Sequence, residues 1–223
     1  MSKEDQLLIL ARSRQNTHWE GFNNIGDYHG GAYECDYVSP YTKSCDNVNS
    51  DVMLVLQDWC SHDYLNRPID STLIEKGLDP TLPTNKNLER LLNTHLGLSL
   101  SDIYATNLLP FIKLGGMSAA IPMKILKLAA TEFTRPQIDI VKPNMVVCFG
   151  LNTFNALLNS YAMKGYRTIG EAIEHPVFIG KGVAILCQSH PGQLGQNNRN
   201  KGGVDRVSED WRRMSEIYVG CSS

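Results

Sequence analysis

Polar residues that could take part in bond cleavage follow several apolar runs of the chain. Asp58 and its neighbour Gln57 come directly after "VMLVL", Asn107 follows "DIYAT", and His190 follows "VAILCQS". A carboxylate and an imidazole together suit acid–base cleavage of a polar bond. An amide offers both a hydrogen-bond donor and an acceptor. These four side chains are therefore our candidates for a reactive site.

The sequence narrows the reaction classes. It holds no Gly-x-Ser-x-Gly nucleophile elbow and no phosphate-binding P-loop. The cluster "DWCSHD" offers Asp58, His62 and Asp63, which could bind a metal together with His190. Their spacing matches no standard ligand pattern. A metal-dependent hydrolase therefore stays as one alternative.

The candidate residues stand at the ends of expected strands. Four apolar runs predict strands, at 51–57, 101–110, 144–150 and 182–191. Four segments with helical spacing predict helices, at 83–97, 118–142, 152–161 and 205–219. This alternation predicts a mostly parallel sheet with helices on both faces. Because ligands bind such sheets outside the carboxyl ends of the strands, we expect Asp58, Asn107 and His190 to converge on one rim.

Local signals place some helix boundaries. Thr84 is the expected N-cap of the helix at 83–97, and Gly97 lies past its end. The helical region at 118–142 contains Pro136, so we expect it to bend there.

The first 50 residues have a different composition. Residues 3–14 have helical spacing, whereas residues 15–50 are rich in Gly, Asn, Asp and Tyr and predict an ordered loop. Long ordered loops are usually functional. We therefore divide the chain into an extension at 1–50 and an α/β domain at 51–223, and we expect the extension to wrap the mouth of the site.

The bulk composition is that of a globular protein. The chain has 223 residues, of which 42% are hydrophobic and 20% charged, with a net charge of -2. This charge argues against a protein that coats DNA by bulk electrostatics. No apolar run approaches the roughly 18 residues of a membrane helix, and no signal peptide is present, so we expect a cytoplasmic protein without membrane partners. The six cysteines form no Cys-x-x-Cys pair, and we expect free thiols.

Four motifs in order resemble those of the uracil-DNA glycosylase superfamily. Residues 56–61, "LQDWCS", correspond to its first motif, Gly-Gln-Asp-Pro-Tyr-His, and "YATNLLP" supplies its strand ending in asparagine. The segment 137–158, "QIDIVKPNMVVCFGLNTFNALL", resembles a third characteristic segment. The last motif, His-Pro-Ser followed closely by leucine, is matched by "SHPGQLG" at 189–195. The resemblance covers about residues 51–215.

The resemblance implies a fold and an activity. The fold is a three-layer α/β/α arrangement around a central four-stranded, mostly parallel sheet. The activity is that of a monofunctional DNA glycosylase, which flips a uracil or a related deaminated base out of DNA and hydrolyses its N-glycosidic bond in base excision repair. No cofactor is implied. We expect a monomer, because a rim that binds DNA must stay open.

The resemblance also assigns roles. Asp58 would stabilise the cationic sugar and position water, and His190 would donate a hydrogen bond to the departing base. Asn107 would read the polar edge of the base, Gln57 would contact it, and Trp59 would form a wall at the mouth of the pocket. The residues implied in base or DNA contact beyond these are Cys60, Ser189, Pro191, Gly192, Leu194 and Arg199. Among them, Leu194 would fill the hole that the flipped base leaves in the duplex.

Several departures from the superfamily leave the substrate open. Cys60 replaces a tyrosine that excludes thymine, so a larger base could enter, and Gly192 replaces the serine of the last motif. The region that normally carries a base-stacking phenylalanine, "DSTLIEKGL", has no aromatic residue. The expected substitutes are Trp59, Tyr64, Tyr33, Tyr37 and Tyr41. The spacing of the cysteines predicts no iron–sulfur cluster. A nucleic-acid-binding protein with weak or no catalysis on the same fold is the second alternative.

Overall fold

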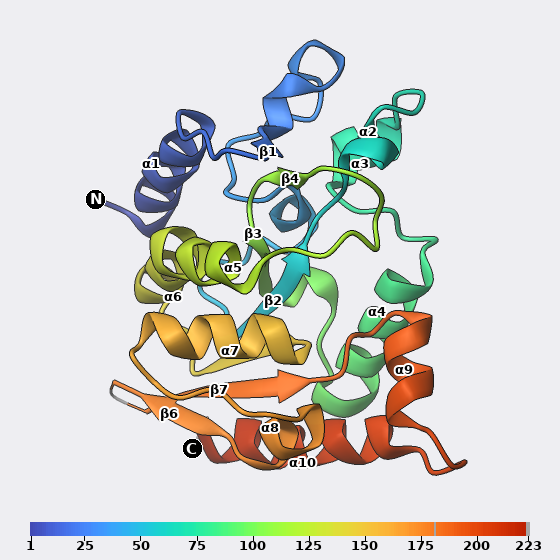
Figure 1. Ribbon diagram of the computed structural model, residues 1–223. Helices are drawn as coiled ribbons and strands as arrows, with labels where there is room; N and C mark the ends of the chain where they lie inside the picture. Colours follow the sequence, from blue (N-terminus) through green and yellow to red (C-terminus); the bar gives the residue numbers. More distant parts are fainter. Residues whose placement is uncertain (181, 222–223) are drawn as a thin grey trace.

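A five-stranded sheet forms the centre of the protein. The computed structural model describes residues 1–180 and 182–221. The strand order is β3 (Tyr104–Leu109), β2 (Val52–Asp58), β5 (Met145–Phe149), β7 (Val183–Gln188) and β6 (Val177–Ile179). The first four strands are parallel, and β6 pairs antiparallel with β7 at one edge (Figure 1). The mixed α/β class is therefore confirmed, whereas the prediction of four strands was one strand short.

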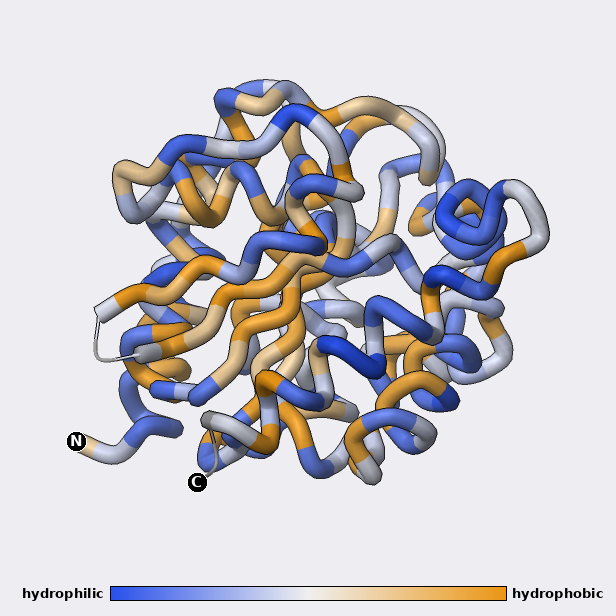
Figure 2. The backbone as a smooth tube through the Cα atoms, turned by 90° about the horizontal axis from the view of Figure 1, so that it is seen from below, coloured by the Kyte–Doolittle hydropathy of each residue, from blue (hydrophilic) through white to orange (hydrophobic). Residues whose placement is uncertain are grey.

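The central strands are apolar on both faces, as helices cover both sides of the sheet. In β2 the residues Val52 to Leu56 are all buried, and β5 is buried throughout. Figure 2 shows these strands as a hydrophobic band surrounded by more hydrophilic connections. Successive side chains of β2 point to opposite faces of the sheet, so Leu54 packs in one helical layer and Val55 in the other.

Helices form a layer on each face of the sheet. One layer contains α5 (Met123–Ala129), α6 (Arg135–Val141), α7 (Leu151–Ser160) and α8 (Ile169–Glu174), with α1 (Lys3–Gln15) packed outside α6. The other layer contains α4 (Pro83–Leu96) and α10 (Arg206–Cys221), which pack against each other. Trp211 of α10 is fully buried and stacks on Phe149 of β5. The expected helical layers on both faces are thus present.

Two expected local features differ from the structure. Leu82, rather than Thr84, is the N-cap of α4, because Pro83 occupies the first turn, where its missing N–H is tolerated. The long helical region begins at Met123, and a π-helical turn at Ala130–Thr134 joins α5 to α6 just before Pro136. The expected bend at Pro136 stays a prediction, and the irregularity that the structure has beside it is this wider turn. Gly97 ends α4 with a φ of 67°, as predicted.

The first 50 residues pack onto the same core. The helix α1 is present as predicted, and β1 (Phe22–Asn23) pairs with β4 (Ile112–Lys113). The buried cluster that includes Leu54 also contains Tyr33 and Tyr41. Three short helices, α2 (His62–Leu65), α3 (Ser71–Lys76) and α9 (Gln193–Arg199), complete the fold. Within the described ranges, no helix combines the length and the apolar character needed to cross a membrane.

Candidate functional site

Asp58 and His190 lie where two cavities meet, at the carboxyl ends of the central strands. Asp58 ends β2, and His190 follows β7 by two residues. Both line a smaller cavity of about 130 Å³ and a larger one of about 550 Å³. Asn107 of β3 lines the smaller cavity, opposite Leu56 in the register of β2 and β3. The three side chains expected to converge on one rim are therefore brought together.

Aromatic and aliphatic side chains form the walls of the smaller cavity. Trp59, Tyr64 and Tyr41 line it, the last of them from the leading segment. Trp59 is fixed, because its indole N–H donates to the carbonyl of Gly77 at 2.7 Å. Tyr41 is held by its hydroxyl, which donates to Asn85 Oδ1 at 2.8 Å. These rings offer flat apolar surfaces to a planar ligand.

The other aromatic candidates lie elsewhere. Tyr33 packs edge-on against Trp59 and does not line the cavity. Tyr37 lines a separate cavity, described below. Cys60 does line the smaller cavity, and burial raises the pKa of its thiol far above the ordinary value. Cys60 is therefore a small neutral wall residue.

Asn107 places a hydrogen-bond donor at the smaller cavity. Its Oδ1 accepts from the hydroxyl of Ser39 at 2.6 Å. Its Nδ2 is buried and has no partner among the described residues. Buried polar groups of folded proteins are nearly always satisfied, so this amide is available to donate to a water or a ligand beside it.

Asp58 is held in a nearly buried ion pair. Lys113 Nζ lies 2.7 Å from Asp58 Oδ2, and the two side chains are 5% and 11% exposed. The same ammonium group donates to the carbonyl of Met117 at 2.6 Å. Gln57 Nε2 donates to Asp58 Oδ1 at 3.2 Å. The carboxylate is therefore fixed in orientation.

His190 is held as a neutral imidazole with a defined tautomer. The backbone N–H of Gly192 donates to His190 Nδ1 at 3.0 Å, so Nδ1 is the acceptor and Nε2 carries the proton. Desolvation lowers the pKa of His190 below its usual value, and the charge of Asp58 opposes this only in part. The ring can therefore donate a hydrogen bond into the cavities near neutral pH.

Glycines beside His190 leave room for its ring and backbone. A Cβ on Gly192 would lie 2.9 Å from His190 Nδ1 and 2.9 Å from Thr84 Oγ1. A Cβ on Gly195 would lie 2.2 Å from the backbone oxygen of His190. The glycine at 192 is thus explained by its close approach to the imidazole.

The larger cavity combines polar groups with a helix N-terminus. Gln57 and Lys113 line it together with Gly150, Leu151 and Asn152 at the start of α7. Gln57 lines the larger cavity and not the smaller one, whereas Leu56 lines the smaller one. Successive side chains of β2 point to opposite faces of the sheet, which separates these two residues. Gly150 has a φ of 93° and provides no side-chain cap. The N–H groups of the first turn of α7 favour a negatively charged ligand, whereas the charge of Lys113 is taken up by Asp58.

Exposed apolar side chains line the cavities and begin the helix that follows His190. Met117 lines both cavities and is 51% exposed, and Leu82 lines the smaller one. Leu194, at the start of α9, is 75% exposed. Large apolar side chains beside a cavity commonly mark a binding surface.

The remaining predicted DNA contacts have other environments. Ser189 is buried at the end of β7, and its hydroxyl has no partner among the described residues. The carbonyl of Pro191 accepts from Asn87 Nδ2 at 2.9 Å, which ties the loop to α4. Arg199 donates two hydrogen bonds to Asp210, at 2.6 and 2.9 Å. This pairing leaves Arg199 little charge for a phosphate, and it joins α9 to α10 instead.

The side chains that suggested a metal site, those of "DWCSHD" and His190, are not placed to bind one ion together. His62 Nδ1 bonds to the hydroxyl of Tyr28 at 2.9 Å, and its Nε2 bonds to Asn66 at 2.8 Å. Within residues 1–180 and 182–221, no three His, Cys, Asp or Glu side chains are placed to share a metal. The cysteines at 35, 45, 60, 148 and 187 are free thiols, as predicted, whereas the side chain of Cys221 lies outside the described part.

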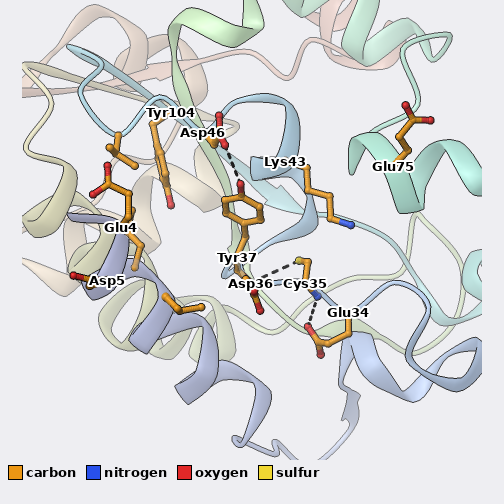
Figure 3. Close-up of a pocket in the computed structure, with 13 residues that line it drawn as sticks. Glu4, Asp5, Glu34, Cys35, Asp36, Tyr37, Lys43, Asp46, Glu75 and Tyr104 are labelled. Carbon is orange, nitrogen blue, oxygen red and sulfur yellow. Dashed lines mark hydrogen bonds between the residues drawn. The ribbon is translucent and has the colours of Figure 1, made fainter. Parts of the chain in front are cut away.

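A third cavity, of about 800 Å³, lies at the opposite end of the strands. Tyr104 at the start of β3 lines it, together with Tyr37, whose hydroxyl donates to Asp46 at 2.9 Å (Figure 3). Its other lining residues include five further carboxylates, namely Glu4, Asp5, Glu34, Asp36 and Glu75. This concentration of negative charge disfavours phosphate groups, so we place the candidate site at the other two cavities.

Two residues of the site were missed by sequence reasoning. Lys113 is a lone lysine after an apolar run, and a buried lysine needs a partner, which was the available signal. Ser39 lies in an aperiodic loop and offered no signal of its own. No family model matches the chain, and no curated protein matches it. The function is therefore argued from the geometry.

Proposed function

We propose that the protein is a DNA glycosylase that removes uracil or a related deaminated base. The observation that carries the proposal is the position of Asp58 and His190 between two unlike cavities. The smaller cavity has aromatic walls and a buried amide donor, and it suits a planar base. The larger cavity has the N-terminus of α7 in its wall, and it suits the sugar-phosphate. A nucleotide flipped out of DNA spans both environments.

The proposed chemistry follows from this arrangement. As the N-glycosidic bond breaks, positive charge develops on the sugar and negative charge on the base. Asp58 would stabilise the sugar and orient the attacking water, and the Nε2–H of His190 would donate to an oxygen of the departing base. The bonding electrons leave with the base, water supplies the hydroxyl group at the anomeric carbon, and the second proton of that water neutralises the departing base. Fixed donors and acceptors of this kind lower the barrier without reorganisation.

The surroundings of the site agree with a DNA substrate. Leu194 would enter the space that the flipped base leaves, because it is exposed and lies close to His190 in the chain. The four parallel strands with helices on both faces are compatible with the fold of the uracil-DNA glycosylase superfamily. We infer membership of that superfamily from the order of the four motifs and the placement of Asp58, Asn107 and His190 at the strand ends.

Base release from DNA is the direct test. Wild type, Asp58→Asn and the control Asp139→Asn, which changes an exposed carboxylate, are incubated with oligonucleotides bearing uracil, hypoxanthine or xanthine, with and without chelator. Abasic sites are then cleaved with alkali. We expect strand breaks with wild type and the control, and a loss of about a hundredfold or more with Asp58→Asn. Folded wild-type protein that releases no base would overturn the proposal.

One observation favours a second candidate, a DNA-binding protein with little catalysis. Lys113 compensates the charge of Asp58, which weakens the field available to a cationic sugar. Salt-sensitive binding of DNA without base release would support this candidate, because phosphate contacts release counterions. Absence of DNA binding would exclude both candidates.

A further inference from the structure

The hydroxyl of Ser39 connects the leading segment to the smaller cavity. Ser39 is fully buried, and its Oγ accepts the backbone N–H of Tyr41 at 3.2 Å. The same hydroxyl donates to Asn107 Oδ1 at 2.6 Å. A serine hydroxyl carries a single proton, so this donation uses its whole capacity as a donor.

These contacts fix the orientation of the Asn107 amide. If the amide were rotated by half a turn, its NH₂ group would face Ser39, and the serine proton would lose the acceptor it has here. Both groups are buried, so an unmade hydrogen bond would be expensive. The favoured orientation therefore turns Oδ1 toward Ser39 and leaves Nδ2 without a partner, in a residue that lines the smaller cavity.

The unpaired Nδ2 offers only donors to a ligand. A base that presents a carbonyl oxygen at this edge completes the hydrogen bond. A base that presents an exocyclic amino group places donor against donor and leaves both buried groups unsatisfied. Deamination replaces such an amino group with a carbonyl, so this one orientation separates a deaminated base from its parent.

We propose that Ser39 is a positioning residue that makes the smaller cavity select bases with a carbonyl over bases with an amino group. The inference rests on the proposed function, since it names the specificity of that same site. It also gives the leading segment a role. Ser39 caps the 3-10 helix Pro40–Ser44 through Tyr41 N–H, and Tyr41 itself forms part of the cavity wall.

Binding of free bases tests the inference without requiring catalysis. Uracil and cytosine are titrated separately into wild type, Ser39→Ala and Thr42→Val, and the shifts of backbone amide signals at the cavity are followed by NMR. Thr42→Val is the matched control. Thr42 is buried in the same 3-10 helix and donates to the carbonyl of Ala105 of β3 at 2.7 Å, but it does not line the cavity.

We expect wild type and Thr42→Val to prefer uracil over cytosine by roughly tenfold or more. In Ser39→Ala the amide is free to turn, so the preference should narrow to within about threefold. If Ser39→Ala does not fold, Ser39→Cys provides the same comparison, because a thiol is a weak donor.

Three results would overturn the inference: an unchanged preference in the Ser39 variant, no preference in wild type, or no shift of cavity signals with either base. The two proposals can be told apart. If wild type binds uracil selectively, Ser39→Ala narrows this preference and no base is released, the glycosylase activity is contradicted and the positioning role of Ser39 stands. If base is released and the preference is unchanged in Ser39→Ala, the glycosylase activity stands and the positioning role is contradicted.

Discussion

Lys113 Nζ lies 2.7 Å from Asp58 Oδ2, and both side chains are nearly withdrawn from solvent. The pair joins the end of β2 to β4, which in turn pairs with β1 of the leading segment. The residue proposed to stabilise the sugar is therefore held by an element that pairs with a strand of the leading segment.

Removal of Lys113 should destabilise the protein strongly. Lys113→Met leaves a buried carboxylate without its partner, and we expect a loss of about 3–5 kcal/mol in the free energy of unfolding. Denaturant titration measures it. In the double variant Asp58→Asn, Lys113→Met the loss should be clearly smaller than the sum of the two single losses.

An exposed ion pair provides the control. Arg212 and Glu216 of α10 form an ion pair whose side chains are 61% and 64% exposed. Arg212→Met should therefore change the free energy of unfolding by less than about 1 kcal/mol. Equal losses of free energy in Lys113→Met and Arg212→Met would contradict a buried pair at Asp58.

The activity should persist below the usual titration range of histidine. Desolvation lowers the pKa of His190, so its neutral, donating form survives below the ordinary value of about 6.5. The rate of base release, measured from about pH 5 to pH 8, should fall only at the acid end of this range. His190→Gln should be slower and lose that acid limb, whereas His18→Gln, at an exposed position, should keep the wild-type profile.

The same shift affects stability. The unfolded chain binds a proton at His190 more readily than the folded protein does. The free energy of unfolding therefore decreases as the pH falls below the pKa that His190 has in the unfolded chain. His190→Gln should therefore reduce the loss of stability on acidification. A rate of base release that already falls at or above pH 7 would contradict the lowered pKa of His190.

Much of the fold could be predicted because the central strands are continuous apolar runs. β2, β5 and β7 each contain five consecutive apolar residues, and the helices between them are long enough to show their spacing. β6 escaped prediction because it has three residues, which are half-buried or exposed and pair antiparallel at an edge. So short a segment has no periodicity to detect.

Only the site residues at the ends of predicted strands could be predicted from the sequence. Asp58, Asn107 and His190 follow from the rule that ligands bind at the carboxyl ends of parallel strands. Ser39 and Lys113 come from segments without periodicity, and long-range contacts bring them in. Arg199 was expected to contact DNA, but its partner on the next helix, Asp210, could not be predicted from the sequence.

Replacement of Gly195 by alanine should move His190. Alanine normally stabilises a helix relative to glycine by up to about 1 kcal/mol. At position 195 the new Cβ would meet the backbone oxygen of His190 at 2.2 Å, so we expect Gly195→Ala to lower both the stability and the rate of base release. Gly170→Ala in α8 is the control, because its Cβ would make only an ordinary contact of 3.6 Å with Arg199. A stabilised, fully active Gly195→Ala protein would show that the loop can yield.

Leu194 should matter for duplex DNA and not for folding. Its side chain is 75% exposed, so Leu194→Ala should change the free energy of unfolding by no more than about 0.5 kcal/mol. If the side chain fills the space of the flipped base, the variant should release base from a duplex more slowly than wild type, by about tenfold for a lost contact near 1.4 kcal/mol. On single-stranded DNA, which has no stack to fill, the two proteins should act alike. Ile9→Ala, which removes an exposed side chain of α1, should match wild type on both substrates. Equal losses of Leu194→Ala on single and double strands would assign Leu194 to general DNA contact instead.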